Sequence, residues 1–426
     1  MVDVAKVRMF GQNIGTFVWD DSYRVARFEY DNDFVGKGIE PSPIMMPVQQ
    51  GRIYSFGSLN WDTFNGLPGM LADSLPDTYG RALFDQWLTL TGRTTSNPVE
   101  SLCFLGQRCM GALEFEPATG PSSDANMKFE IDTLIDVARE ALSKKKDFGV
   151  NLDVDRKAAI AEILRLGTSA GGQRAKAIIA YNKETGEVRS GQISAPEGFD
   201  YYLIKLDGVT AEAGLKETEN FGRLEYSFYE LVKKCGIDMT ECSLIEENGR
   251  AHFLTKRFDR ENGRKIHMQT LCGMAHYDFR LKNGHSYEQA FNVMRRLRLP
   301  YSQAQEMFRR IVFNVIVRNQ DDHTKNISFL MDSSGQWSLS PAYDMGFAYN
   351  PLGAWTATHQ MSINGKFDNI TRADLLSLAN ANNIKNASEI IDQVCETTAG
   401  WPELAKNCGV PQKMIDGIVP HMLLSI

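Results

Sequence analysis

Short apolar runs alternate with turn signals along roughly the first hundred residues, a pattern typical of a small antiparallel sheet. The runs lie at 7–11, 15–19 and 24–30. From Leu71 the apolar spacing becomes helical, through 79–88, and Gly92 stands where a helix C-cap is expected. The segment 117–124 is rich in Pro, Gly and Ser, so we expect a domain boundary there.

Beyond that boundary the pattern changes twice. Apolar spacing predicts helices over 131–142 and 155–166, separated by a Lys-rich turn at 144–146. Four short segments rich in aromatic or branched residues then predict strands, at 177–181, 201–206, 243–246 and 251–258. From Ser286 onward the spacing is mostly helical and is interrupted by one hairpin signal. The pattern therefore predicts an α+β protein.

The composition excludes several classes of protein. Hydrophobic residues make up 43% and charged residues 23% of the 426 positions, which argues against a disordered chain. The 46 Lys and Arg against 53 Asp and Glu give a net charge of -7, so nucleic-acid binding by this chain alone is not expected as its main activity. The one basic concentration is expected to form an ion-paired helix surface, or alternatively to contact a partner or phosphate; it comprises Arg295, Arg296, Arg298, Arg309, Arg310 and Arg318.

Cysteine, histidine and hydropathy patterns narrow the setting. The seven cysteines are scattered, with neither C-x-x-C nor zinc spacing, which indicates reduced thiols in a cytoplasm. No histidine-based metal motif occurs, so no dedicated transition-metal site is expected. The chain starts without an apolar leader, and no window reaches about 18 uncharged apolar residues, so we expect neither secretion nor a membrane.

The stretch 319–330 carries the most informative polar residues. It follows an apolar helix and precedes a predicted hairpin with its turn at 332–335. Protein kinases use this order, because one Asp orients the attacking hydroxyl while an Asn five residues later and an Asp beyond the next hairpin hold Mg²⁺. Asp321, Asn326 and Asp344 fit those three roles. Singly, each is an ordinary turn or cap residue, and only the ordered set favours a kinase.

A kinase also needs a strand lysine for the α- and β-phosphates and a helix glutamate that holds this lysine. Lys205 lies inside the predicted strand 201–206, and Glu225 begins an amphipathic helix twenty residues later. The alternative is an edge-strand lysine and a first-turn glutamate that complements the helix dipole. Lys256 and Phe258 end another predicted strand, where a kinase places the hinge that packs on adenine; a core position for Phe258 is the alternative.

A Gly/Ser loop precedes the predicted strand 177–181. The loop consists of Gly167, Thr168, Ser169, Ala170, Gly171 and Gly172. Such loops let backbone N–H groups approach phosphates, although the Walker A spacing is missing. The loop also matches G-x-S-x-G, the nucleophile elbow of α/β-hydrolases, which needs a strand before the Ser and a helix after it. The predicted order is the reverse, so a serine hydrolase using Ser169 stays an alternative only.

In their order along the chain, these stretches resemble the HipA family of serine/threonine kinase toxins. The similarity rests on 167–172, 204–206, 256–260, 267–269, 321–326 and 341–344, and it extends to 104–113. It therefore covers nearly the whole chain. The resemblance implies ATP and Mg²⁺ as cofactors. It also adds His323 and Lys325 to the nucleotide-binding set.

The resemblance implies a bilobed, protein-kinase-like fold. It divides into an N-terminal antiparallel-sheet subdomain at 1–120, a nucleotide-facing lobe at 125–260 and a mostly helical catalytic lobe at 261–426. The implied partners are a helix-turn-helix, HipB-like antitoxin, operator DNA contacted through the complex, and a protein substrate, in some members an aminoacyl-tRNA synthetase. A catalytically weak corepressor is the other alternative.

Two positions carry further expectations from the resemblance. Ser169 matches a serine that some members autophosphorylate. At Asp322 the chain departs from the family, where Gly is common, so a second carboxylate beside Asp321 is expected to change the local pKa or the metal affinity.

Overall fold

The computed structural model describes residues 2–76, 78–120, 131, 135, 174–191, 195–210 and 219–426. The predicted Lys-rich turn and the Gly/Ser loop at 167–172 lie outside these ranges, as do the predicted helices 131–142 and 155–166 apart from two buried helical residues, Ile131 and Ile135. The described chain mixes sheets and helices, so the predicted α+β class is confirmed.

Residue contacts divide the chain into two compact units. The first comprises 1–39, 48–222 and 243–267, and the second comprises 40–47, 223–242 and 268–426. The three-part division predicted from the sequence, with boundaries near 120 and 260, stays a prediction. All seven cysteines lie in the described ranges as free thiols.

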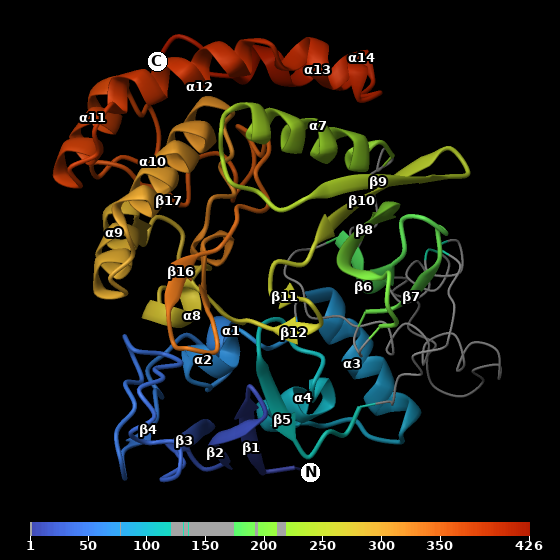
Figure 1. Ribbon diagram of the computed structural model, residues 1–426, viewed down its shortest axis with the longest axis vertical. Coiled ribbons are helices and arrows are strands. Elements are labelled where there is room, and N and C mark those ends of the chain that lie inside the picture. The colour runs from blue at the N-terminus through green and yellow to red at the C-terminus, as the bar shows by residue number, and fades with distance from the viewer. Residues whose placement is uncertain are drawn as a thin grey trace. The chain divides into compact units, whose positions relative to one another are not determined.

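The first unit opens with an antiparallel sheet in the order β4-β3-β2-β1-β5 (Figure 1). Its strands are β1 Val4–Met9, β2 Gln12–Asp20, β3 Val25–Tyr30, β4 Ile53–Tyr54 and β5 Leu113–Glu116. Alternate side chains enter a core in which Val7, Phe17 and Phe28 are fully buried, as period-two spacing requires. The described helices of this segment are α1 Trp61–Phe64, α2 Gly69–Ala72, α3 Thr78–Leu90 and α4 Pro98–Leu105. The predicted sheet and the predicted helix before Gly92 are therefore confirmed.

A second antiparallel sheet in this unit has the order β7-β6-β8-β10-β9. Its strands are β6 Arg174–Tyr181, β7 Val188–Ser190, β8 Asp200–Thr210, β9 Cys242–Glu247 and β10 Arg250–Lys256. All four strands predicted here are present. The last one ends at Lys256 rather than at Phe258, because a turn begins there and leads to the short hairpin of β11 Arg260–Glu261 and β12 Arg264–Lys265.

A buried charge cluster fastens the end of β10 to the segment before β5. The Asp259 carboxylate accepts from Arg257 Nε at 2.8 Å, from Arg260 Nη1 at 2.8 Å and from the Gly111 backbone N–H at 2.7 Å. Both guanidinium groups also donate to the carbonyl of Cys109. Burial alone would raise the pKa of Asp259, but the two arginines outweigh it and hold that pKa well below its usual range. The cluster therefore fixes the turn that carries Phe258.

The second unit is mostly helical. Its helices are α7 Phe221–Lys234, whose first two residues belong to the first unit, α8 Leu271–Ala275, α9 Tyr287–Arg296, α10 Tyr301–Ile316, α11 Arg372–Ala381, α12 Ala387–Ala399, α13 Trp401–Asn407 and α14 Gln412–Ile418, with the 3-10 turns η1 Thr324–Asn326 and η2 Val419–His421. α10 packs against α12 (Figure 1). Phe228 of α7 stacks on Trp401 of α13 with ring centroids 4.8 Å apart.

Short strands complete the second unit. The hairpin of β15 Ser328–Met331 and β16 Trp337–Leu339 joins β13 His267–Thr270 in one sheet, and β14 His285–Ser286 pairs with β17 Met361–Ser362. The predicted hairpin is thus confirmed, and Gly335 adopts the positive φ of 88° that its turn requires. The segment 340–370 is largely irregular, contrary to the mostly helical expectation, because many of its polar groups bond to side chains instead of to a helix ladder.

Candidate functional site

The helix α10 delivers the candidate catalytic loop. Met307, Ile311 and Val315 are buried at helical spacing, as the sequence predicts. The helix ends at Ile316, and the next turn closes when the backbone N–H of Asn319 donates to the Asn314 carbonyl at 2.8 Å. The loop therefore starts from a rigid helix end.

Asp321 presents one carboxylate oxygen to the protein and one to solvent. Its Oδ1 accepts from the indole Nε1 of Trp355 at 2.6 Å and lies 3.9 Å from His323 Nε2. Within the described ranges, Oδ2 accepts no hydrogen bond, and 45% of the side-chain surface remains exposed. An incoming hydroxyl can therefore reach Oδ2.

The site shifts the proton affinities of two neighbouring groups. Burial among the surrounding residues raises the pKa of the Asp321 carboxyl, while His323 and the hydrogen bond from Trp355 oppose the rise and the nearby Asp344 and Asp322 carboxylates add to it. Burial also lowers the pKa of His323, against the pull of Asp321 and Asp344. Asp321 is thus more basic than an ordinary aspartate, which suits a group that receives a proton.

Asn326 and Asp344 bring two further oxygen donors to the same unit. The Asn326 amide Nδ2 donates to the Asp321 carbonyl at 2.8 Å, which commits its nitrogen and leaves its oxygen as the available ligand atom. Asp344 follows the hairpin at a backbone φ of 50° and is close enough to influence both Asp321 and His323 electrostatically. The predicted trio therefore gathers in one compact unit.

Asn319, the first residue of the loop, ties the loop to Asp344. The sequence does not predict this role. The Asn319 amide Nδ2 donates to Asn314 Oδ1 at 2.9 Å and to the Asp344 carbonyl at 3.1 Å. An Asn at a helix end is too common to signal such a role. The long-range bond becomes visible only in the fold.

Asp322 is a buried anchor rather than a second carboxylate facing the site. Its Oδ2 accepts from Tyr287 Oη at 2.7 Å and pairs with His359 Nδ1 at 2.9 Å, while Oδ1 accepts from the Gln360 backbone N–H at 2.7 Å. Only 1% of the side chain is exposed. As expected, Asp322 contributes to the raised pKa of Asp321. Its own oxygens are engaged by these three partners, so Asp322 is not positioned as a metal ligand.

His323 and Lys325 contact one aromatic ring. The His323 ring meets Phe279 edge-on at 5.3 Å, and the Lys325 ammonium lies 4.9 Å from the same ring centroid. Thr324 between them donates to the Tyr277 carbonyl at 2.7 Å. These contacts hold the loop, and the nucleotide-binding role expected for His323 and Lys325 stays a prediction.

Lys205 lies on the central strand of the second sheet, so the edge-strand alternative is wrong. Directly opposite it stand Lys176 on β6 and Phe253 on β10, and its ammonium lies 5.8 Å from the Phe253 ring. Side chains opposite one another share a face of the sheet, so two lysines face the same side. Lys176 carries no functional signal in the sequence, because its partner strand lies about thirty residues away.

Other predicted site residues are placed within their own units. Lys256 donates to Asp200 Oδ2 at 2.7 Å, and the half-buried Phe258 sits in the turn held by the Asp259 cluster. Glu225 lies in the second turn of α7, because the helix starts at Phe221 rather than at Glu225. Lys205 and Glu225 belong to different units, so their pairing stays a prediction.

The Gly/Ser loop lies outside the described residues, and with it Gly167, Thr168, Ser169, Ala170, Gly171 and Gly172. The described chain resumes at Arg174, the first residue of β6. A strand therefore follows the loop closely, where a nucleophile elbow needs a helix.

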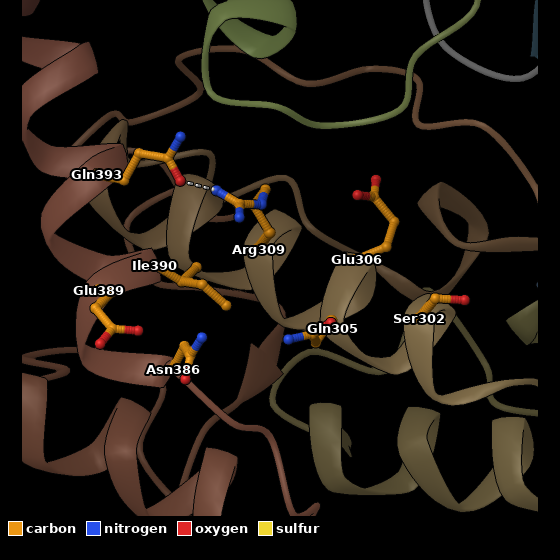
Figure 2. A pocket seen from close by; sticks show the side chains of 8 residues that line it. All are labelled: Ser302, Gln305, Glu306, Arg309, Asn386, Glu389, Ile390 and Gln393. Atoms are coloured by element: carbon orange, nitrogen blue, oxygen red, sulfur yellow. Dashed lines mark hydrogen bonds between the residues drawn. The ribbon is translucent and has the colours of Figure 1, made fainter.

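The basic concentration is largely engaged in contacts inside the second unit. Arg310 forms an ion pair with Glu306 at 2.7 Å, whereas Arg309 donates to the Cys235 carbonyl. Figure 2 shows Arg309 bonded to Gln393 at the edge of a hollow of about 370 Å³ between α10 and α12. The hollow is lined by Ser302, Gln305, Glu306, Arg309, Asn386, Glu389, Ile390 and Gln393, none of which is a predicted site residue. The ion-paired surface expected from the sequence is thus realised only at Arg310 among the six.

The described part of the chain holds neither a cluster of three metal-ligating side chains nor a membrane-spanning helix. No three His, Cys, Asp or Glu side chains gather there as a cation site. No helix in those ranges is long and apolar enough to cross a membrane.

Comparison with known proteins gives consistent matches. The family model for the HipA-like C-terminal domain matches residues 168–401, and the model for the HipA N-terminal domain matches residues 5–116. A Haemophilus influenzae protein named "Putative kinase" is 29% identical over 28% of this chain and 39% of its own length. A Sinorhizobium fredii protein named "Putative kinase Y4dM" is 27% identical over 46% of this chain and 52% of its own length.

The fold is similar to a solved structure of Shewanella oneidensis HipA with HipB and operator DNA. The TM-score is 0.67 at 17% identity, over 98% of this chain and 94% of that one. A likeness at this identity shows the fold. The matches to the two curated relatives span about half of their length or less.

Proposed function

Because the chain belongs to the HipA family, we propose that it is a serine/threonine protein kinase that transfers the γ-phosphate of ATP to a hydroxyl group of a protein. The observation that carries the proposal is the Asp321 carboxylate, whose Oδ2 is open to solvent in the same unit as Asn326 and Asp344. Phosphoryl transfer needs a positioned carboxylate beside two oxygen ligands for a metal.

The chemistry follows from the geometry of Asp321. The substrate hydroxyl donates a hydrogen bond to Oδ2, which aims its oxygen at the γ-phosphorus. A new oxygen–phosphorus bond forms as the bond between the γ-phosphorus and the bridging β,γ-oxygen breaks, and ADP leaves. The hydroxyl proton passes to Asp321, whose raised pKa favours its acceptance.

Asn326 and Asp344 would hold Mg²⁺. An amide oxygen and a carboxylate are hard oxygen ligands, and Mg²⁺ bound to a nucleotide takes one or two carboxylates together with phosphate oxygens and water. The metal would neutralise charge on the β- and γ-phosphates. The positive φ of Asp344 and the Asn319 bond to its carbonyl fix the backbone from which this ligand projects.

The second sheet would bind the nucleotide. Lys205 and Lys176 are directly opposite each other on β8 and β6, so both side chains lie on one face of the sheet, and two cationic side chains on one face suit a polyanion such as ATP. The Gly/Ser loop at 167–172 just before β6 would add backbone N–H groups, with Glu225 holding Lys205 and Phe258 contacting adenine. The Lys256 ammonium already bonds to Asp200, so its contact with nucleotide requires an exchange of partner.

The proposed partners follow from the family. We propose that the chain pairs with a HipB-like, helix-turn-helix antitoxin and contacts operator DNA through that complex; the Shewanella structure contains HipA, HipB and operator DNA. The net charge of -7 supports DNA contact through a basic partner rather than by this chain alone. The protein substrate belongs to the class that carries an accessible serine or threonine hydroxyl.

Intact mass after incubation with ATP and Mg²⁺ tests the proposal. A kinase that autophosphorylates Ser169 gains about 80 Da, and Ser169→Ala loses the main adduct. If the chain is instead a serine hydrolase, a fluorophosphonate probe labels the wild type and does not label Ser169→Ala. A catalytically weak corepressor shows neither, yet supershifts operator DNA in the presence of its antitoxin. The kinase proposal would be overturned if neither the chain nor any added protein gained a phosphate.

A further inference from the structure

Trp355 bonds directly to the carboxylate that the proposed reaction uses. Its Nε1–H donates to Asp321 Oδ1 at 2.6 Å, across 34 residues of sequence. The bond fixes one oxygen of Asp321 and so fixes the direction in which the other, open oxygen faces. A carboxylate held by one short bond loses much of its torsional freedom, which is the condition for a well-aimed general base.

The segment that carries Trp355 is anchored on the same loop. Gln360 donates its side-chain Nε2–H to the Trp355 carbonyl at 2.7 Å and to the Gln320 carbonyl at 3.1 Å. Its backbone N–H donates to Asp322 Oδ1 at 2.7 Å. Together with the pairing of His359 Nδ1 and Asp322 Oδ2, four hydrogen bonds therefore link the loop to the segment 355–360, each between residues at least 34 positions apart in the sequence.

Buried side chains make this anchor rigid. Asp322 is 2% exposed, His359 is 3% exposed and Tyr287 is 2% exposed. An ionised carboxylate only accepts, so His359 donates from Nδ1 and Tyr287 donates from its hydroxyl. A buried carboxylate with three donors is costly to rearrange, because any lost donor leaves charge uncompensated. Asp322 thus fixes the segment on which Trp355 sits.

The chemistry of the donor matters as much as its place. A Lys or Arg at this distance would stabilise the charged carboxylate strongly and make it a weaker base. An indole N–H is a neutral donor and has no acceptor that could compete for the substrate proton. Trp355 can therefore orient Asp321 without placing a full positive charge beside the carboxylate.

We propose that Trp355 is a positioning residue that orients Asp321 for the substrate hydroxyl, and that Asp322 acts through Gln360 to hold Trp355 in place. The proposal rests on the proposed kinase function. Asp322 thus helps to align Asp321, whereas the sequence indicates only an additional charge beside it.

Indole resonances test the contact without any turnover. In protein labelled with ¹⁵N at the indole nitrogens of its six tryptophans, Trp355→Phe identifies the Trp355 signal by its loss. Asp321→Asn should move that signal, since it removes the charge from the acceptor, and Asp322→Asn should move it through the anchor. The Trp337 signal should stay in place, because its Nε1 donates to the Glu40 carbonyl at 3.2 Å instead. A Trp355 signal unmoved by Asp321→Asn would overturn the proposal.

Single-turnover transfer from MgATP tests the role. Trp355→Phe keeps the ring and removes the donor, so the transfer rate should fall by about tenfold to a hundredfold while the Kd for MgATP stays unchanged. Trp337→Phe is the matched control, since it removes an indole bond of the same kind away from the loop, and should transfer at the wild-type rate. Equal rates in Trp355→Phe and wild type would reject the positioning role and leave the kinase intact. A wild-type protein that transfers no phosphate would instead reject the proposed function, and this inference with it.

Discussion

Replacing Asp344 by Asn separates the charge of this residue from its backbone conformation. Asp344 adopts a φ of 50°, in the left-handed region that costs most side chains about 1 kcal/mol or more and that Asn accepts readily. Asp344→Asn should therefore leave the free energy of unfolding unchanged, and Asp344→Ala should lower it by about 1 kcal/mol. Asn383→Ala, at a φ of 55° on an exposed helix end, is the matched control for strain alone.

Nucleotide binding should respond to both Asp344 variants. Each removes the anionic ligand proposed for Mg²⁺, so the Kd for ADP in the presence of Mg²⁺ should rise at least about tenfold, or about 1.4 kcal/mol. In EDTA the variants and the wild type should bind ADP equally. Calorimetric titration with and without Mg²⁺ measures both values, and urea unfolding measures the stability. A Mg²⁺-dependent gain in affinity that persists in Asp344→Asn, or that is lost in Asn383→Ala, would contradict the ligand role proposed for Asp344.

Three further changes have defined outcomes. Asp259→Asn leaves two buried arginines short of a charge and should cost about 3 to 5 kcal/mol in urea unfolding, against at most about 1 kcal/mol for the exposed ion-pair variant Asp200→Asn. Burial lowers the pKa of His276 to about 4, so the folded state resists protonation of this side chain. The free energy of unfolding should therefore fall as the pH drops from about 6.5 to 4, by at most about 3 kcal/mol. This loss should disappear in His276→Asn, because Asn tolerates the local φ of 57°. Ser169→Asp should raise the Kd for ATP, because it places an anion in a loop proposed to bind phosphates, and Ser169→Ala should not; equal affinities for both variants would contradict that role.

The features that the sequence predicts correctly are those encoded by neighbouring residues. Period-two spacing gives the strands β1 to β3, and apolar residues every four positions give α10. The order of Asp321, Asn326, hairpin and Asp344 is also local, since about 25 residues contain it all. These signals do not depend on how distant segments meet.

The features that the sequence does not predict depend on contacts between distant segments. Nothing about a lone Trp in a polar loop indicates that its indole reaches Asp321. The sequence pattern predicts the start of α7 four residues after Phe221. The helix starts earlier because the Asp207 carboxylate accepts from the backbone N–H groups of Asn220 and Phe221, before the amphipathic pattern begins. The sequence predicts that the Asp322 carboxylate acts as a second charge in the candidate site. In the structure this carboxylate is buried and anchors the segment that carries Gln360.

If Asp321 serves phosphoryl transfer as proposed, its conservative variant should lose activity and keep its nucleotide affinity. Asp321→Asn keeps the shape of the side chain and can still accept the Trp355 bond, but it cannot take up the substrate proton. Under single-turnover conditions with MgATP bound, its transfer rate should fall at least about a hundredfold while its Kd for MgATP remains that of the wild type. A variant that binds MgATP normally and transfers phosphate at the wild-type rate would contradict the account.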